Sequence, residues 1–273
     1  MRKRSFVIKS DGSSVPFDFN KVRTTCIRAG ANNKLATQVA QKISKKIHPG
    51  ITTRQIYRMV LEILALNDED RLIGHRYRLK ESIMLMGPAG FSFENYVGAV
   101  LEARGYEIKS KRSEVQGTCV SHEIDITAVR DSHVRYMVEC KFHNSPGIYT
   151  GIKEALYTHA RFLDLAGRFD KEILVCNTKV SHEAITYGMC IGQEILSWHY
   201  PPEYGLEKII EDNGLYPITI LGLKKKELDT FSQNNIMLAR DLLDIDPQKW
   251  FQKLSISMHR LETLQNLARQ MIR

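Results

Sequence analysis

The sequence predicts a mixed α/β protein with a mostly helical N-terminal domain that carries a β-hairpin, a central mixed sheet with flanking helices, and a small helical C-terminal module. Helical periodicity dominates roughly the first third of the chain. Two alternating apolar segments joined by a turn follow, and helices then alternate with short apolar strands, which is typical of a mixed sheet. Glycine and proline clusters place the domains at residues 1–88, 89–202 and 203–273.

The N-terminal domain begins with a predicted hairpin, in which residues 5–9 and 15–17 flank a turn at Asp11 and Gly12. Apolar residues then recur at helical spacing up to the cluster Gly87 to Gly90. Four helices are expected there: one capped by Asp18 or Asn20, one over residues 35–47, one capped by Thr52 or Thr53, and one over residues 70–86.

The central domain shows helices and strands in the order helix, three strands, helix, strand, helix, strand. The second and third strands form a hairpin around the turn-like residues Arg130 to His133. In the helix over residues 150–165, we expect Ile152, Leu156, Leu163 and also Ala155 to face inward. The remaining predicted elements are a helix ending near Gly105, strands at 106–112, 173–176 and 194–198, and a helix from Ser181 to Ile191.

Lys153, Tyr157 and Arg161 recur four residues apart on the helix over residues 150–165. This stripe is either a solvated face or a surface that contacts the DNA backbone.

In the C-terminal module we expect short helices between residues 206 and 236 and one amphipathic helix over residues 247–273. The apolar residues of this last helix lie near heptad spacing, but it is too short for a coiled coil. The module loosely resembles a helix-hairpin-helix unit, a fold that contacts the DNA backbone.

Composition limits the function classes. The 273 residues hold 39 Lys and Arg against 31 Asp and Glu, and the resulting charge of +8 suits a polyanionic partner. Five cysteines lack the paired spacing of a metal site, which indicates reduced thiols. Since no apolar run approaches the roughly 20 residues of a membrane span, we expect a soluble, cytoplasmic protein that binds no membrane.

Asp125, Glu139 and Lys141 lie in the two strands of the central hairpin. Residues two apart in a strand share a face, so Glu139 and Lys141 point the same way. Asp125 lies on the adjacent strand, on the face opposite Ile124 and Ile126. Gathering two carboxylates and an ammonium is costly unless a cation or a substrate uses them.

This Asp…Glu-x-Lys pattern resembles the PD-(D/E)xK nuclease superfamily, and residues 87–200 are similar to its Mrr-like restriction endonuclease branch. The resemblance implies a DNA endonuclease of the restriction or defence type that depends on Mg²⁺ or Mn²⁺. It implies Asp125, Glu139 and the carbonyl of Cys140 as metal ligands, with Lys141 orienting the attacking water. Glu94 is either a further acidic ligand or a surface carboxylate.

Two histidines, His122 and His143, bracket the same strands, and Glu123 lies two residues before Asp125 on the same strand face. Glu123 either joins the metal site or faces solvent. Each histidine is either a polar residue at a strand end, a phosphate contact or a catalytic base.

The first 86 or so residues resemble an ATP cone, a nucleotide-sensing domain, on the segments Val7 to Gly12, Val15 to Lys21 and Ile51 to Ile56. The resemblance implies that Val7, Lys9 and Ser10 line an adenine nucleotide (ATP or dATP), that Lys21 meets its phosphates and that Thr53 contacts its base or sugar. Arg76 or Lys80 is expected to replace the arginine that the family more often has at the position of Ser10. The alternative is that the lysines are solvated surface charge.

Taken together, these patterns predict a nuclease that binds DNA, responds to an adenine nucleotide and forms a homo-oligomer. Two alternatives stay open: a nucleotide-responsive DNA-binding protein on a catalytically inactive nuclease fold, and a nuclease of DNA repair or of junctions.

Overall fold

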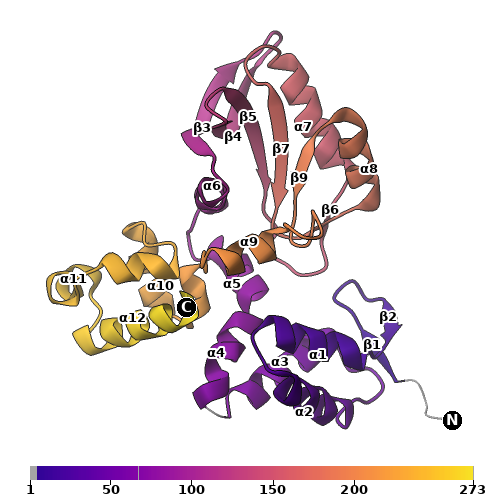
Figure 1. Ribbon diagram of the computed structural model, residues 1–273, viewed down its shortest axis with the longest axis vertical. Helices are drawn as coiled ribbons and strands as arrows, with labels where there is room; N and C mark the ends of the chain where they lie inside the picture. Colours follow the sequence, from indigo (N-terminus) through magenta and orange to yellow (C-terminus); the bar gives the residue numbers. More distant parts are fainter. Residues whose placement is uncertain (1–4, 67, 273) are drawn as a thin grey trace.

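The computed structural model describes residues 5–66 and 68–272, and it has the predicted mixed α/β architecture (Figure 1). The N-terminal domain packs its helices beside a two-stranded hairpin. Its elements are β1 (Phe6–Ile8), β2 (Ser14–Pro16), α1 (Phe19–Arg28), α2 (Asn33–Ser44), α3 (Thr53–Leu64), α4 (Asp68–Tyr77) and α5 (Leu79–Met86).

Side-chain caps set where the first helices begin. The Asp18 side chain accepts a hydrogen bond from the backbone N–H of Lys21 and so starts α1. Thr52 starts α3 through a capping box with Gln55. The prediction of a single helix over residues 70–86 is wrong, because the backbone turns at Arg78 and separates α4 from α5.

The central domain holds a five-stranded sheet in the order β3-β4-β5-β7-β9. The pairs β3–β4 and β4–β5 are antiparallel, whereas β5–β7 and β7–β9 are parallel. The elements are α6 (Phe93–Ala103), β3 (Glu107–Gln116), β4 (Ser121–Arg130), β5 (Val134–Lys141), β6 (Tyr149–Thr150), α7 (Ile152–Asp164), β7 (Lys171–Cys176), β8 (Lys179–Val180), α8 (His182–Ile191) and β9 (Glu194–Leu196).

The predicted hairpin between β4 and β5 is confirmed. Asp131 and Ser132 both have positive φ, which suits a tight turn between twisted strands. Helix α6 covers one face of the sheet, and α7 and α8 cover the other (Figure 1). The expected helices on both faces are therefore present.

The C-terminal part consists of short helices that pack on the junction of the other two domains (Figure 1). The prediction of one continuous helix over residues 247–273 is wrong, because the helix breaks at Ser255, which has φ 50° and ends α11. The elements are α9 (Leu206–Asp212), η1 (Ile218–Leu221), α10 (Lys225–Gln233), η2 (Ala239–Asp244), α11 (Pro247–Leu254) and α12 (Met258–Ile272).

Several hydrogen bonds tie this C-terminal part to its neighbours. His75 Nδ1 lies 2.8 Å from the carbonyl of Ile220, and Arg76 donates to the carbonyl of Met271 at 3.1 Å. The hydroxyl of Tyr96, in α6, donates to the carbonyl of Leu215 at 2.7 Å. One hydrophobic core also runs through α5, α6, η1 and α12, so the C-terminal helices brace the N-terminal domain against the sheet domain.

Helix α7 lies in a different rotation from the predicted one. Ile152, Leu156 and Leu163, which were expected to face inward, are exposed. Ala155, Thr158 and Arg161 are the residues that α7 buries.

We expect Leu264→Ala, in α12, to lower the free energy of unfolding by about 2–5 kcal/mol, because this side chain is fully buried and its loss leaves a cavity. Leu163→Ala, in α7, is the matched control, since its side chain is 59% exposed; a change below about 0.5 kcal/mol is expected. Urea unfolding measures both. A larger loss in Leu163→Ala would contradict the observed rotation of α7.

Among residues 5–66 and 68–272, no helix has both the length and the apolar character needed to cross a bilayer.

Candidate active site

Asp125 lies where strands β4 and β5 separate. The two strands pair from Arg130↔Val134 to Ile126↔Val138, and the pairing stops there. One residue further along β4, the carboxylate of Asp125 accepts a hydrogen bond from the backbone N–H of Cys140 at 2.7 Å. A side chain thus replaces the sheet ladder, and it brings Asp125 beside the segment that carries Glu139 and Lys141.

The separation of the strands also changes which side chains share a face. Ile126 packs in the core under α6, whereas Ile124 packs with Met137 and Leu165 on the opposite face. The prediction that Asp125 lies opposite both isoleucines is therefore wrong, because the strict alternation of a strand is lost where the strand leaves its neighbour.

Glu139 is 5% exposed and carries two cationic partners. Its Oε1 lies 2.6 Å from Nζ of Lys141, and its Oε2 forms an ion pair with the guanidinium of Arg161. The Lys141 side chain is 32% exposed, so one face of the ion pair reaches solvent. These contacts bring Glu139 and Lys141 together, as predicted from their spacing.

Burial raises the pKa of Asp125 to about 6. The N–H of Cys140 opposes this rise in pKa, and the nearby charges of Glu139 and Glu94 add to it. The site therefore carries negative charge at a cost, which a bound cation would relieve.

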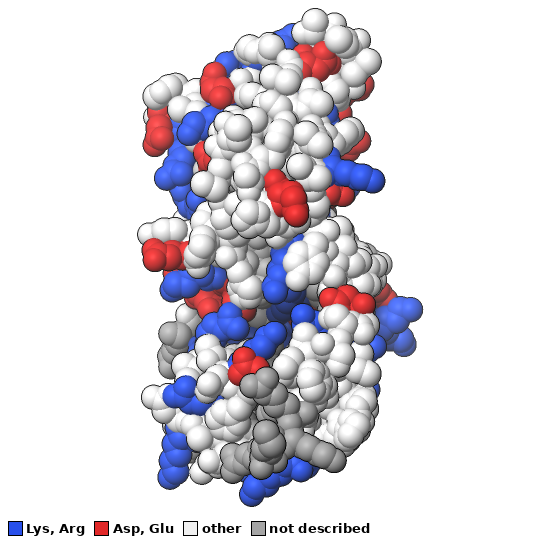
Figure 2. All heavy atoms as spheres, turned by 90° about the vertical axis from the view of Figure 1, so that its right-hand side faces the viewer, with Lys and Arg blue, Asp and Glu red and all other residues white. Residues whose placement is uncertain are grey.

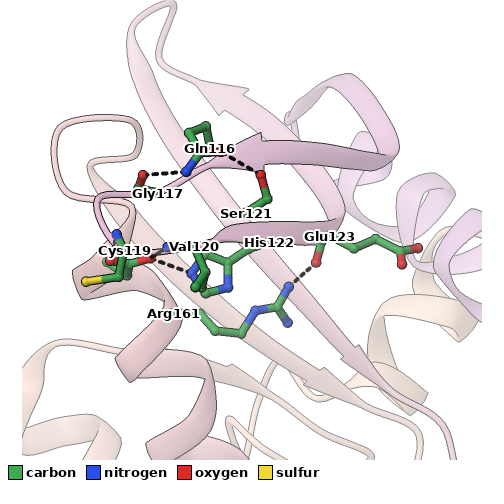
Figure 3. Close-up of polar contacts among 9 residues, drawn as sticks. Gln116, Gly117, Cys119, Val120, Ser121, His122, Glu123 and Arg161 are labelled. Carbon is green, nitrogen blue, oxygen red and sulfur yellow. Dashed lines mark hydrogen bonds and ion pairs between the residues drawn. The ribbon is translucent and has the colours of Figure 1, made fainter.

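Sequence reasoning missed the role of Arg161. Its side chain is 8% exposed and does not lie on a solvated stripe with Lys153 and Tyr157. Besides Glu139, it contacts the backbone carbonyl of Glu123 (Figure 3). Spacing alone gives no signal for this buried face, because any residues three apart share one side of a helix and an arginine is usually exposed.

A small cavity of about 320 Å³ opens beside these residues and is bordered by Asp125, Tyr157 and Arg161. His122 also lines it, with Nε2 2.8 Å from a carboxylate oxygen of Asp164 in α7. Hydrogen bonding by His122 lowers the pKa of Asp164. Glu123 lines the cavity as well, and Figure 3 shows its exposed side chain extending away from Arg161.

Glu94 sits in the first turn of α6. It accepts hydrogen bonds from the hydroxyl of Ser92 at 2.5 Å and from Arg112 at 3.2 Å. Its charge acts on Asp125, and both partners contact the same carboxylate oxygen, Oε2. Glu94 is therefore near the site, at its edge.

The donor set fits a divalent cation in part. Asp125 and Glu139 supply carboxylates, and the residue whose carbonyl is the predicted third ligand, Cys140, contacts Asp125 through its backbone N–H. Mg²⁺ accepts a small number of protein oxygens and keeps waters as its other ligands. Across the described part of the chain, no cluster of three or more His, Cys, Asp or Glu has a metal-holding arrangement, so the fit depends on these two carboxylates.

The pKa of Asp125 makes stability depend on pH. Because the folded value, about 6, exceeds the ordinary value of 3.8, folding favours the protonated form. The contribution of Asp125 to wild-type stability should therefore fall by about 1–2 kcal/mol as pH rises from about 4 to about 6, after allowance for the access of water. Asp125→Asn, which mimics the protonated acid, should lack this loss. Urea unfolding at pH 4 and pH 7.5 in chelator measures it, and equal pH dependence in both proteins would contradict the expectation.

The predicted nucleotide residues fall into two groups. Lys9, Ser10 and Thr53 line a second cavity, of about 1200 Å³, between the N-terminal and sheet domains. Val7 is 5% exposed and belongs to the hydrophobic core, and Lys21 is exposed on α1, outside the lining.

Between the two candidate replacements for an arginine at position 10, only Lys80 is among the lining residues of this second cavity. Arg76 instead donates to the carbonyl of Met271. His143 does not face this cavity either: its ring contacts the hydroxyl of Thr150 at 3.2 Å.

Comparisons with known proteins agree with this organisation. Residues 5–81 match the ATP cone domain family, residues 87–195 match a restriction endonuclease family, and residues 216–272 match a family described as AF1548-like, C-terminal. An uncharacterized protein of Archaeoglobus fulgidus is 46% identical over 151 residues, which cover 55% of this chain and 85% of that protein.

Two solved structures are also similar. A protein of unknown function, AF1548, is 40% identical with a TM-score of 0.56, over 66% of this chain and 96% of that one. The DNA modification-dependent restriction endonuclease AspBHI is 13% identical with a TM-score of 0.33, over 59% of this chain and 39% of that one. The second likeness is too weak to carry an argument.

Proposed function

This chain belongs to one family with the uncharacterized Archaeoglobus fulgidus protein and with the protein of unknown function AF1548, and from its ATP cone and its restriction endonuclease domain we propose a metal-dependent endodeoxyribonuclease of the restriction or defence type. ATP or dATP bound to the cone regulates it. One observation carries the proposal: Asp125, Glu139 and Lys141 converge where strands β4 and β5 separate.

Hydrolysis of a phosphodiester needs an activated water and relief of the charge that develops on the phosphate. A divalent cation held by Asp125 and Glu139 supplies Lewis acidity at the phosphate when it is bound. Lys141, the most accessible cation beside Glu139, orients the attacking water and stabilises the developing negative charge. Tyr157 and Arg161 border the small cavity beside Asp125, which leaves room for the substrate backbone next to that carboxylate.

The proposal is tested by incubating supercoiled plasmid, linear duplex and single-stranded DNA with the full-length protein and Mg²⁺ or Mn²⁺. Nicking or cutting with metal, and none in chelator, is expected. Titration with ATP and dATP should change the rate. Solution mass with and without nucleotide tests the expected homo-oligomer. Absence of cleavage under every metal, DNA and nucleotide condition would remove the proposal.

One observation favours a second function, DNA binding without cleavage. Both oxygens of Glu139 are already paired, with Lys141 and Arg161, so this carboxylate is satisfied without a metal. That arrangement suits a nucleotide-responsive DNA-binding protein that no longer cuts. DNA binding that persists in chelator, without cleavage when metal is added, is the result that would favour it.

A further inference from the structure

The second cavity is built by two domains. The cone contributes Lys9, Thr53, Arg54 and Arg58, and α5 contributes Lys80. The sheet domain contributes residues 144–146, which belong to the loop between β5 and β6. Figure 2 shows Lys and Arg side chains gathered in the hollow between the two lobes of the molecule.

The charge of this cavity suits a polyanion. Its lining, all within the described part of the chain, includes six lysine or arginine side chains and one carboxylate, that of Glu81. The volume of about 1200 Å³ exceeds what a small ion needs and is adequate for a nucleotide-sized ligand. Tyr57, on the same wall, offers an aromatic surface against which a base can pack.

The loop from the sheet domain is held tightly against the cone. Gly147 has φ +90°, and a Cβ at this position would lie 2.4 Å from the hydroxyl oxygen of Ser10. Glycine therefore permits both the backbone conformation and the close approach. At its base the loop is fixed by Asn177, which accepts from the N–H of His143 at 2.8 Å and donates to its carbonyl at 2.7 Å.

The same loop begins directly after the candidate catalytic strand. Lys141 is the last residue of β5, and only Phe142 and His143 separate it from the cavity-lining residues 144–146. A ligand that contacts Asn144 is therefore separated by three peptide bonds from Lys141, the residue proposed to act on the DNA phosphate. No movement of whole domains is needed for such a connection.

We propose that this interdomain cavity binds a nucleoside triphosphate in contact with both domains, so that the nucleotide clamps the loop 143–149 that leads from Lys141. The cone holds one side of the ligand, and Lys80 with residues 144–146 holds the other. The proposal rests on the nucleotide binding of the proposed function and extends that binding to the nuclease domain.

Hydrogen exchange of the full-length protein, with and without ATP, tests the clamp directly. Backbone amides of residues 52–58 and of residues 143–149 should both exchange at least about threefold more slowly when ATP is bound. Protection confined to the cone would overturn the proposal, as would the absence of any ATP binding. Protection of residues 143–149 by duplex DNA and not by ATP would overturn it as well.

Two variants sharpen the test. Lys80→Ala should raise the Kd for ATP about tenfold in calorimetry without DNA, whereas Lys42→Ala, an exposed lysine of α2 outside the cavity, should leave it unchanged. Gly147→Ala should displace the loop from Ser10 and abolish the ATP-dependent protection of residues 143–149 while the cone stays protected. An unchanged Kd in Lys80→Ala together with unchanged protection in Gly147→Ala would overturn the proposal.

These readouts do not depend on cleavage, so the two proposals can fail separately. A protein that shows the ATP-dependent protection at both segments but never cuts DNA supports the clamp and removes the nuclease. A protein that cuts DNA and shows ATP-dependent protection only in the cone keeps the nuclease and removes the clamp.

Discussion

Asp125→Asn should lower metal-dependent DNA cleavage by at least about 100-fold. Asparagine has nearly the same shape and can still accept the hydrogen bond from the N–H of Cys140, but it has no charge with which to hold a cation. Single-turnover cleavage of supercoiled plasmid with Mn²⁺ measures the effect. Lys141→Ala should show a loss of similar size, because Lys141 is the more exposed of the two cations that pair with Glu139.

Loss of folding does not explain such a result, because Asp125→Asn is expected to be at least as stable as wild type in chelator at neutral pH. Glu102→Gln is the matched control, since this exposed carboxylate of α6 lies outside the lining of the cavity beside Asp125. Its rate should stay within about threefold of wild type. Wild-type cleavage in Asp125→Asn would show that the separation of β4 and β5 is not the active site.

The part of the site that the sequence predicted is the part that depends on local geometry. Alternation along β5 places Glu139 and Lys141 on one face, and the turn at Asp131 and Ser132 brings β4 alongside. These relations follow from strand periodicity and turn chemistry. These relations do not depend on which helices pack on the sheet.

The rotation of α7 could not be predicted in the same way. Counting apolar residues directs Ile152, Leu156, Leu163 and Ala155 inward, but of these the helix buries Ala155 alone. Thr158 and Arg161 are buried beside it. The face that packs is decided by the space above the sheet and by the buried charge of Glu139, which are both set by residues far away in sequence. Local periodicity contains neither.

The break between α11 and α12 has a similar origin. Heptad spacing continues through residues 247–273, yet Ser255 adopts positive φ and the two helices pack on each other. The approach of Gly147 to Ser10 is likewise a meeting of distant segments. Contacts between domains leave no periodic signal in either segment.

Arg161→Met should lower the free energy of unfolding by about 3 kcal/mol in chelator. Methionine fills much of the same space without charge, so Glu139, which is 5% exposed, would keep a single cation, that of Lys141. The carbonyl of Glu123 would also lose its donor. Urea unfolding at pH 7.5 measures the loss, and Lys153→Met, on the exposed face of the same helix, should change stability by less than about 0.5 kcal/mol.

A double-mutant cycle with Glu139→Gln separates the ion pair from simple packing. If Arg161 stabilises the fold by compensating the buried charge of Glu139, then the double variant, which removes both charges, should recover at least about half of the stability lost in Arg161→Met. If the arginine acts only through its volume or through its bond to the carbonyl of Glu123, the two losses should add. Since Glu139 is the proposed metal ligand, recovery would also mean that this chain keeps a buried arginine to hold a carboxylate in place before any cation arrives.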